Sequence, residues 1–241
     1  MALLQSRKGV PMIASIHQPD YIPYIPYFIK LALSDIFVFL DDAQYSNSKM
    51  HQWNRIKTPQ GECRLKIPVE KSFGCAINQV RTRDELDWKE NHLKTLHLNY
   101  VRAPFFDRVY EPFQEILLKP YDNLADLNIA INTWIAREFG LQTRIIRASE
   151  LKIESRSEER ILDICNLVGA DVYISGNGAR KYQVEEHFTA RNIQLKYVNN
   201  APFVYNQLWN EFIPNLSVLD FLFNHGFDWN YILDKVGNPV T

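Results

Sequence analysis

Two short apolar runs near the start of the chain each end in polar residues. Residues 12–16 lead into His17 and Gln18, and residues 36–40, Ile-Phe-Val-Phe-Leu, lead into Asp41 and Asp42. Apolar runs of this length are typical of strands that are buried on both faces. Residues 27–33 between them are apolar enough to form a short packed helix. The pattern predicts a strand, a helix and a second strand parallel to the first.

The polar residues after these two strands are expected to form one site. Parallel strands end at the same edge of a sheet, and ligands of open parallel sheets bind outside that edge. We therefore expect His17 and Gln18 to share a cavity with Asp41, Asp42 and Gln44. A histidine hydrogen-bonded to the backbone and an aspartate that caps a turn are the alternatives to a functional role.

The rest of the chain predicts an α/β protein. A small β excursion is expected over about 50–83, and an α-rich insertion over about 84–141. Helices are expected at 86–101, 106–118, 124–139, 155–168 and 217–223, and strands at 143–147, 171–175 and 193–198. This order is typical of a mostly parallel, doubly wound sheet of the Rossmann-like type. We expect one domain over 12–226, a disordered extension at 1–11 and a C-terminal tail at 227–241.

Composition narrows the class of protein. The chain has 241 residues, 46% of them hydrophobic, which is enough for a full core. Its net charge of −1 gives no support for a general nucleic-acid role. Three cysteines without a CxxC pair argue against a disulfide framework and a structural zinc site, so a reducing cytoplasm is the simplest location. We predict no signal sequence, membrane span or metal site.

Several residues after the second strand are candidates for substrate binding. Arg55 and Lys57, beside Asn54, place a guanidinium and an ammonium two positions apart, as capture of phosphate or carboxylate requires. An ordinary solvated surface is the alternative. Tyr21 lies near the expected polar site, and tyrosines in such places line sugar or nucleobase pockets or else cover the core.

Two further candidates lie later in the chain. His92 stands one helical turn from Trp88, so it is expected near the buried side of its helix, either as a catalytic group or as a histidine with its hydrogen bonds satisfied. A turn containing Ser175, Gly176 and Gly178 precedes Tyr182 and opens onto a helix whose first amide groups form a possible anion seat. The turn lacks the lysine of a P-loop, and an ordinary tight turn is the alternative.

Six segments in order resemble the WbqC-like family. They are Ile16-His-Gln-Pro-Asp-Tyr-Ile-Pro23, Phe39-Leu-Asp-Asp-Ala-Gln-Tyr45, Asn54-Arg-Ile-Lys57, Trp88 with His92, Tyr173-Ile-Ser-Gly-Asn-Gly-Ala179 and Asp220-Phe-Leu-Phe-Asn224. The resemblance covers residues 12–226, nearly the whole chain. Members of that family are associated with bacterial surface-polysaccharide (O-antigen) gene clusters, which implies work on an activated sugar in the cytoplasm.

A looser likeness concerns the start of the chain. A strand, a histidine-bearing turn, a helix and a second strand are similar to nucleotidylyltransferase-like folds, in which such a histidine holds ATP phosphates. Pro19 and Asp20 follow where those folds carry a second histidine. Fold analogy does not assign chemistry by itself.

The leading hypothesis is an enzyme that transfers an acyl or aminoacyl group to a nucleotide-activated amino sugar. His17 would act as a general base or orient a phosphate, and Asp41 or Asp42 would orient its imidazole or bind a metal-phosphate. His92 is a further catalytic candidate. Substrate binding is assigned to Gln18, Tyr21, Gln44, Asn54, Arg55, Lys57, Ser175, Gly176, Gly178 and Tyr182.

Three alternatives remain open at this level. They are nucleotidyl transfer on a sugar, non-catalytic binding of a nucleotide sugar or partner protein, and metal-assisted hydrolysis through Asp41, Asp42, His92 and His17. A nucleotide or an activated acyl donor is a candidate cofactor. The expected partner is a small molecule, a sugar nucleotide, and the sequence assigns neither its identity nor an oligomeric state.

Overall fold

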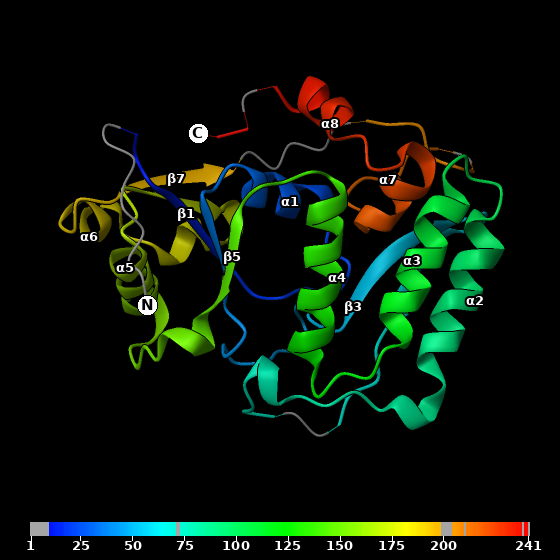
Figure 1. Ribbon diagram of the computed structural model, residues 1–241, viewed down its shortest axis with the longest axis horizontal. Coiled ribbons are helices and arrows are strands. Elements are labelled where there is room, and N and C mark those ends of the chain that lie inside the picture. Colours follow the sequence, from blue (N-terminus) through cyan, green and yellow to red (C-terminus); the bar gives the residue numbers. More distant parts are fainter. Residues whose placement is uncertain (1–9, 71–72, 199–203, 210, 238, 241) are drawn as a thin grey trace.

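A five-stranded parallel sheet forms the centre of the molecule (Figure 1). The computed structural model describes residues 10–70, 73–198, 204–209, 211–237 and 239–240, so most of the extension expected at 1–11 lies outside the described residues. The strands are β1 (Ile13–His17), β2 (Ile36–Phe39), β5 (Arg144–Arg147), β6 (Val172–Gly176) and β7 (Gln194–Val198). Their order is β5-β2-β1-β6-β7, and every neighbouring pair is parallel. The predicted α/β class is confirmed.

The first crossover is the predicted one. Helix α1 (Ile25–Ala32) joins β1 to β2, which pair in parallel with His17 opposite Phe39. Pro26 stands in the first turn of α1, where its missing N–H costs no hydrogen bond. The ends of β1 and β2 therefore lie side by side, as the sequence predicts.

Successive strand residues enter two separate cores, one on each face of the sheet. Ala14 and Ile16 face α5 (Ser157–Val168) and α6 (Glu185–Thr189). Phe37 belongs to the larger core, which also contains residues of α1 and α4 (Leu124–Glu138). Burial of both faces explains why the strands are continuous apolar runs, and it makes the sheet doubly wound.

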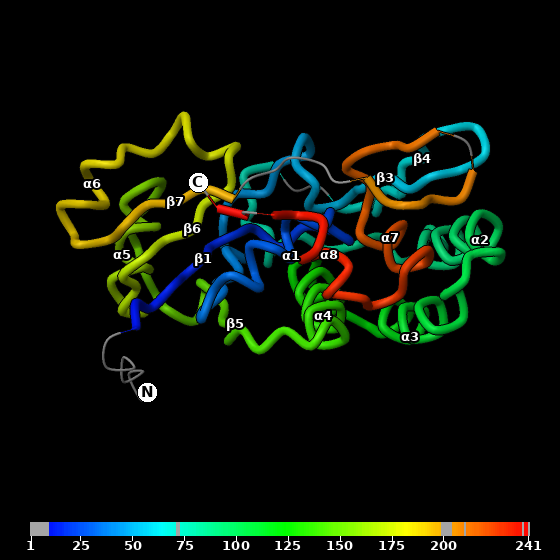
Figure 2. Tube along the Cα trace, turned by 90° about the horizontal axis from the view of Figure 1, so that it is seen from above, coloured from blue at the N-terminus to red at the C-terminus, as the bar shows by residue number. Residues whose placement is uncertain are grey.

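The middle of the chain forms the end of the molecule away from α5 and α6 (Figures 1 and 2). It contains the antiparallel hairpin of β3 (Trp53–Thr58) and β4 (Gly61–Lys66), then α2 (Trp88–Tyr100), α3 (Phe106–Leu118) and α4. Helix α7 (Val218–His225) packs against α3. Within the described residues there are also four short 3-10 turns: η1 (Ile77–Gln79), η2 (Asp84–Leu86), η3 (Ala148–Leu151) and η4 (Asn177–Tyr182).

The segment expected to be a tail contains a helix, α8 (Trp229–Val236). Asp228 caps it by accepting a hydrogen bond from the backbone N–H of Tyr231. Ile232 is fully buried, and the rings of Trp229 and Phe139 lie 5.1 Å apart. Two helical turns give too short an apolar pattern for a prediction from periodicity. No helix in the described residues combines the length and apolarity needed to cross a bilayer.

Candidate functional site

The site lies where the direction of the strand connections reverses. From β1 the chain passes to β2 on one side, and the later strands β6 and β7 lie on the other side of β1. Such a switch point leaves a crevice beyond the carboxyl ends of the strands, and ligands of doubly wound sheets bind there. His17 is the last residue of β1 and stands at this crevice.

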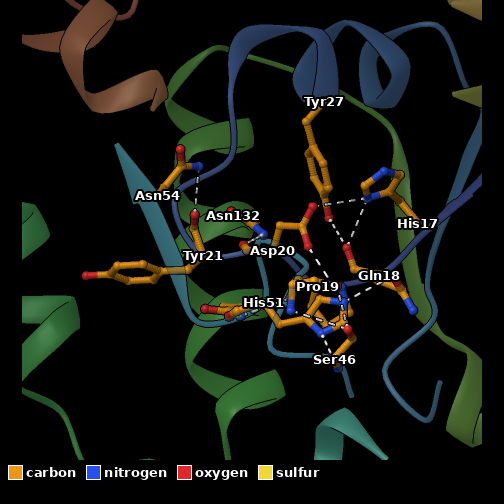
Figure 3. Close-up of polar contacts among 12 residues, drawn as sticks. His17, Gln18, Pro19, Asp20, Tyr21, Tyr27, Ser46, His51, Asn54 and Asn132 are labelled. Atoms are coloured by element: carbon orange, nitrogen blue, oxygen red, sulfur yellow. Dashed lines mark hydrogen bonds and ion pairs between the residues drawn. The ribbon is translucent and has the colours of Figure 1, made fainter. Parts of the chain in front are cut away.

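The imidazole of His17 is held by one of its two nitrogens (Figure 3). Nδ1 lies 3.1 Å from the carbonyl oxygen of Gln18, which only accepts, so Nδ1 carries the proton and donates. The hydroxyl of Tyr27 donates to the same carbonyl at 3.2 Å, and its ring packs edge-on against the imidazole. The lone pair of the neutral ring is therefore on Nε2, where it can accept a proton.

Two buried charged groups lie beside His17. Asp20 Oδ2 is 3.8 Å from His17 Nδ1, and the ammonium of Lys30 donates to the carbonyl of Ile16 at 2.7 Å. Burial raises the pKa of Asp20 to about 7, and burial lowers the pKa of Lys30 to about 7. Burial, and next the charge of Lys30, hold the pKa of His17 well below its usual value. The imidazole is therefore neutral at physiological pH.

His51 is a member of this cluster that the sequence did not predict. Its Nδ1 accepts from the backbone N–H of Ser46 at 3.3 Å, so its Nε2 carries the proton and donates to Gln18 Oε1 at 3.1 Å (Figure 3). The side chain is fully buried, and burial lowers its pKa to about 4. His51 thus fixes the side chain of Gln18, and the backbone carbonyl of the same residue orients His17.

A cavity of about 500 Å³ opens at His17 and Asp20. The His17 side chain keeps 32% of its surface exposed. Other residues that line the cavity are Tyr24, Ser48, Lys49, Met50, Trp53, Arg55 and Asn215. Arg55 Nη1 donates to both carboxylate oxygens of Glu62 at 2.8 Å, whereas Lys49 has no ion pair within the described residues. The cavity thus combines a base, two cations and two aromatic rings. Of the predicted binding residues, Gln18 and Arg55 line it.

Asp41 and Asp42 lie at the same sheet edge but do not line this cavity. Asp41 is buried and accepts hydrogen bonds from the N–H of Ser149 at 3.0 Å and from its hydroxyl at 2.7 Å. Asp42 pairs with Arg160 of α5. The sequence predicted that Asp41 and Asp42 would share a cavity with His17, and the structure differs. The partners of the two acids, Ser149 of η3 and Arg160 of α5, come from much later in the chain. Gln44 lies beyond them and lines two other cavities.

His92, on helix α2, belongs to a separate hydrogen-bond network. Its Nε2 donates to the carbonyl of Lys66 at 3.2 Å, and its Nδ1 accepts from the hydroxyl of Tyr21 at 2.9 Å. Both nitrogens are therefore occupied. The ring is buried against Trp88, and burial lowers its pKa to about 4. The structure does not bring His92 into the cavity of His17.

Asn54 and Lys57 contact the protein's own backbone. The amide of Asn54 donates to the carbonyls of Tyr21 and Ile22 at 3.1 and 2.9 Å (Figure 3). The ammonium of Lys57 donates to the carbonyls of Trp209 and Glu211 at 3.3 and 2.7 Å. Both side chains are buried, so they hold the hairpin to the segments that flank it.

The turn after β6 does not line the cavity either. Ser175 is buried, Gly176 precedes η4 and Gly178 lies within it, and this six-residue 3-10 turn is too short to supply a helix dipole. Tyr182 is exposed beside Lys181. A hydrogen bond and the charge of Lys181 lower the pKa of Tyr182, and the charge of Lys49 lowers it slightly further. Lys49, which lines the His17 cavity, also lowers the pKa of His17 by a small amount.

Asp20, Lys30 and His51 are the site residues that sequence reasoning missed. Lys30 carried a usable signal, because it is the only charged residue in the apolar run 25–33 and a charge there must be buried. Asp20 follows His17 by three positions. His51 carried no local signal. No group of three or more His, Cys, Asp and Glu side chains in the described ranges is arranged to hold a metal ion.

Comparison with known proteins gives a family and one relative. The model of the WbqC-like protein family matches residues 18–230. An uncharacterized protein of Mycobacterium tuberculosis, Rv1507c, is 32% identical over 216 residues, which cover 88% of this chain and 93% of the relative. No solved structure matches significantly.

Proposed function

Because the chain belongs to the WbqC-like protein family, we propose that it is an enzyme of surface-polysaccharide (O-antigen) biosynthesis that acylates a nucleotide-activated amino sugar. The association of the family with O-antigen gene clusters supports the choice of substrate. The transferred group is an acyl or aminoacyl group, and the acceptor is the amine of the sugar. We place the reaction in the cytoplasm, where the three cysteines of the chain would stay as the free thiols that the structure has.

The observation that carries this proposal is the neutral imidazole of His17. Its Nδ1 is committed to the carbonyl of Gln18, and its Nε2 lone pair is available beside a polar cavity. In the proposed reaction, the amine attacks the carbonyl carbon of the donor and Nε2 takes the amine proton. The new C–N bond replaces the bond to the leaving group, which receives the proton from the imidazolium. Asp20, 3.8 Å from Nδ1, stabilises the imidazolium in its charged form.

The lining of the cavity supports binding of a sugar nucleotide. Lys49 and Arg55 provide positive charge for a diphosphate, and Trp53 and Tyr24 provide rings for the base or the sugar. The volume of about 500 Å³ lies within the range of small-molecule sites. In this proposal Asp20 takes the orienting role that the sequence gave to Asp41 or Asp42, and these two acids secure the end of β2.

A transfer assay tests the proposal directly. Nucleotide-activated amino sugars are incubated with the protein and activated acyl and aminoacyl donors, and mass spectrometry detects the added group. We expect an N-acylated nucleotide sugar for at least one pair of substrates and none with His17→Gln. A nucleotide sugar that binds wild type and His17→Gln alike, with no turnover by either, would instead indicate a binding protein.

A further inference from the structure

We propose that a second cavity, lined in part by residues 44–48, binds the acyl donor through an amide-bearing arm. This inference rests on the proposed function, because a transferase needs a place for each of its two substrates. The cavity has a volume of about 1130 Å³ and is lined by residues 44–48, by Gln52 and Lys66 of the hairpin region, and by the turns that follow β4. Ser48 lines both this cavity and the one at His17.

The residue of this cavity that indicates a ligand is Gln52, because its side-chain oxygen has no hydrogen-bond donor in the described residues. Its side chain is 2% exposed and lines the cavity. Its Nε2 donates to Asn47 Oδ1 at 3.2 Å, and the same oxygen accepts from the hydroxyl of Tyr45 at 2.7 Å. Because Asn47 supplies an acceptor, the amide of Gln52 is oriented, and its Oε1 is left as an acceptor without a hydrogen-bond donor among the described residues.

A buried carbonyl oxygen without a donor is destabilising, and a small rotation of the Gln52 amide toward the cavity lets a bound N–H or O–H group supply the missing donor. A ligand for the cavity therefore carries amide or hydroxyl donors. Nearby charges have both signs, since Lys66 and Arg83 lie with Glu70 in the lining. This mixture does not select a polyanion. Apolar contacts are available from Val69 and from Phe73, whose side chain is fully exposed.

A hydrogen-bonded chain joins the two cavities (Figure 3). Ser46 lines the second cavity and donates its N–H to His51, which donates to the side-chain Oε1 of Gln18. The backbone carbonyl of the same Gln18 accepts from His17. Ser48 lines both cavities, and only His51 and Gln18 stand between Ser46 and His17 in this series of hydrogen bonds. A donor arm that contacts Gln52 and passes Ser48 places its acyl carbon beside the amine held near His17.

Binding measured by calorimetry tests this inference without turnover. Pantetheine, an arm with two amide groups, is the probe for the second cavity, and UDP-glucosamine is the probe for the cavity at His17. We expect Gln52→Met to weaken pantetheine binding about tenfold, the effect of losing one hydrogen bond of about 1.4 kcal/mol, and to leave UDP-glucosamine binding unchanged. Gln60→Met is the matched control, because Gln60 is exposed and lines neither cavity.

A second variant covers the case in which Gln52→Met does not fold. Gln44 is exposed and lines the cavity, so Gln44→Trp fills space there with little effect on the core, and we expect it also to weaken pantetheine binding. The inference is overturned if wild type does not bind pantetheine, if both cavity variants bind it as wild type does, or if pantetheine and UDP-glucosamine compete. If neither UDP-glucosamine nor another nucleotide sugar binds, the proposed function is contradicted. The pantetheine measurements then decide separately whether the second cavity binds an amide-bearing arm.

Discussion

His17 and His92 each lie against a tyrosine, and their surroundings give the two imidazoles different chemistry. His92 has both nitrogens occupied, one by Tyr21 and one by the carbonyl of Lys66, and its ring is buried in the insertion. His17 packs against Tyr27, uses one nitrogen on the backbone, and opens the rest of its ring to a cavity.

The comparison shows that burial lowers the pKa of both rings but leaves only one of them able to react. A neutral imidazole is a base when its lone pair faces a substrate. In His92 the lone pair on Nδ1 already accepts the tyrosine proton, so protonation would break a buried hydrogen bond. We therefore propose the catalytic role for His17 and a structural role for His92.

The largest expected effect is on turnover. We expect His17→Gln to lower the rate of transfer by about 10²–10⁴-fold, the usual contribution of a general base, and to change the free energy of unfolding by less than about 1 kcal/mol. The measurements are kcat and chemical denaturation of the same preparation. His92→Gln is the matched control, and its folded fraction should keep the wild-type rate. A larger loss of rate in His92→Gln than in His17→Gln would reverse the assignment.

The next effect is on stability. We expect His92→Leu to lower the free energy of unfolding by about 3 kcal/mol, because the Tyr21 hydroxyl and the Lys66 carbonyl lose their partner in the interior. Tyr21→Phe removes one hydroxyl and should cost about 1 kcal/mol. Urea denaturation at pH 7 measures both. Equal stability of His92→Leu and wild type would mean that this network contributes nothing to folding.

A smaller effect concerns the pH dependence of stability. The pKa of His92 is about 4 in the folded protein and about 6.5 in the unfolded chain, which therefore binds more protons between these values. The stabilisation of the folded state by neutral His92 is complete above pH 6.5 and is lost as the pH falls toward 4. The stability difference between wild type and His92→Leu should narrow by about 2 kcal/mol from pH 7 to pH 4.5. A difference that stays constant over this range would contradict the depressed pKa.

The smallest effect expected is a displaced pH profile of turnover. Burial and then the charge of Lys30 lower the pKa of His17, so Lys30→Met should raise that pKa. The acidic limb of kcat then moves to higher pH, because His17 is protonated over a wider range. Lys49→Met should produce a smaller displacement in the same direction, since Lys49 contributes less to the pKa of His17. An unmoved acidic limb in Lys30→Met would show that another group limits the rate at low pH.

The elements of the fold could be predicted because the local pattern and the global packing agree. The runs before His17 and Asp41 are strands that are buried on both faces, and the structure pairs them in parallel as expected. Helix α3 has the predicted bounds, 106–118. The helix α8 was not predicted, because its eight residues give little periodic signal and its packing against Phe139 depends on tertiary structure.

The site was less predictable for a physical reason. The sequence brought His17 to the correct sheet edge, but it did not show which neighbours would face it. Asp41 turns to Ser149, more than a hundred residues later, and Asp20 takes the place beside the imidazole. Strand direction follows from local pattern, whereas the partner of a side chain at a strand end depends on loops that arrive from distant parts of the chain.

The position of β1 in the sheet has a consequence for biosynthesis of the protein. This strand is synthesised more than a hundred residues before β6, yet Ile13 pairs with Val172 on one of its two edges. During translation, the edge of β1 that pairs with β6 therefore stays unpaired until β6 has been synthesised. Such late closure slows assembly and exposes backbone hydrogen-bonding groups to neighbouring chains. Production at low temperature or with chaperones is expected to raise the yield of native protein.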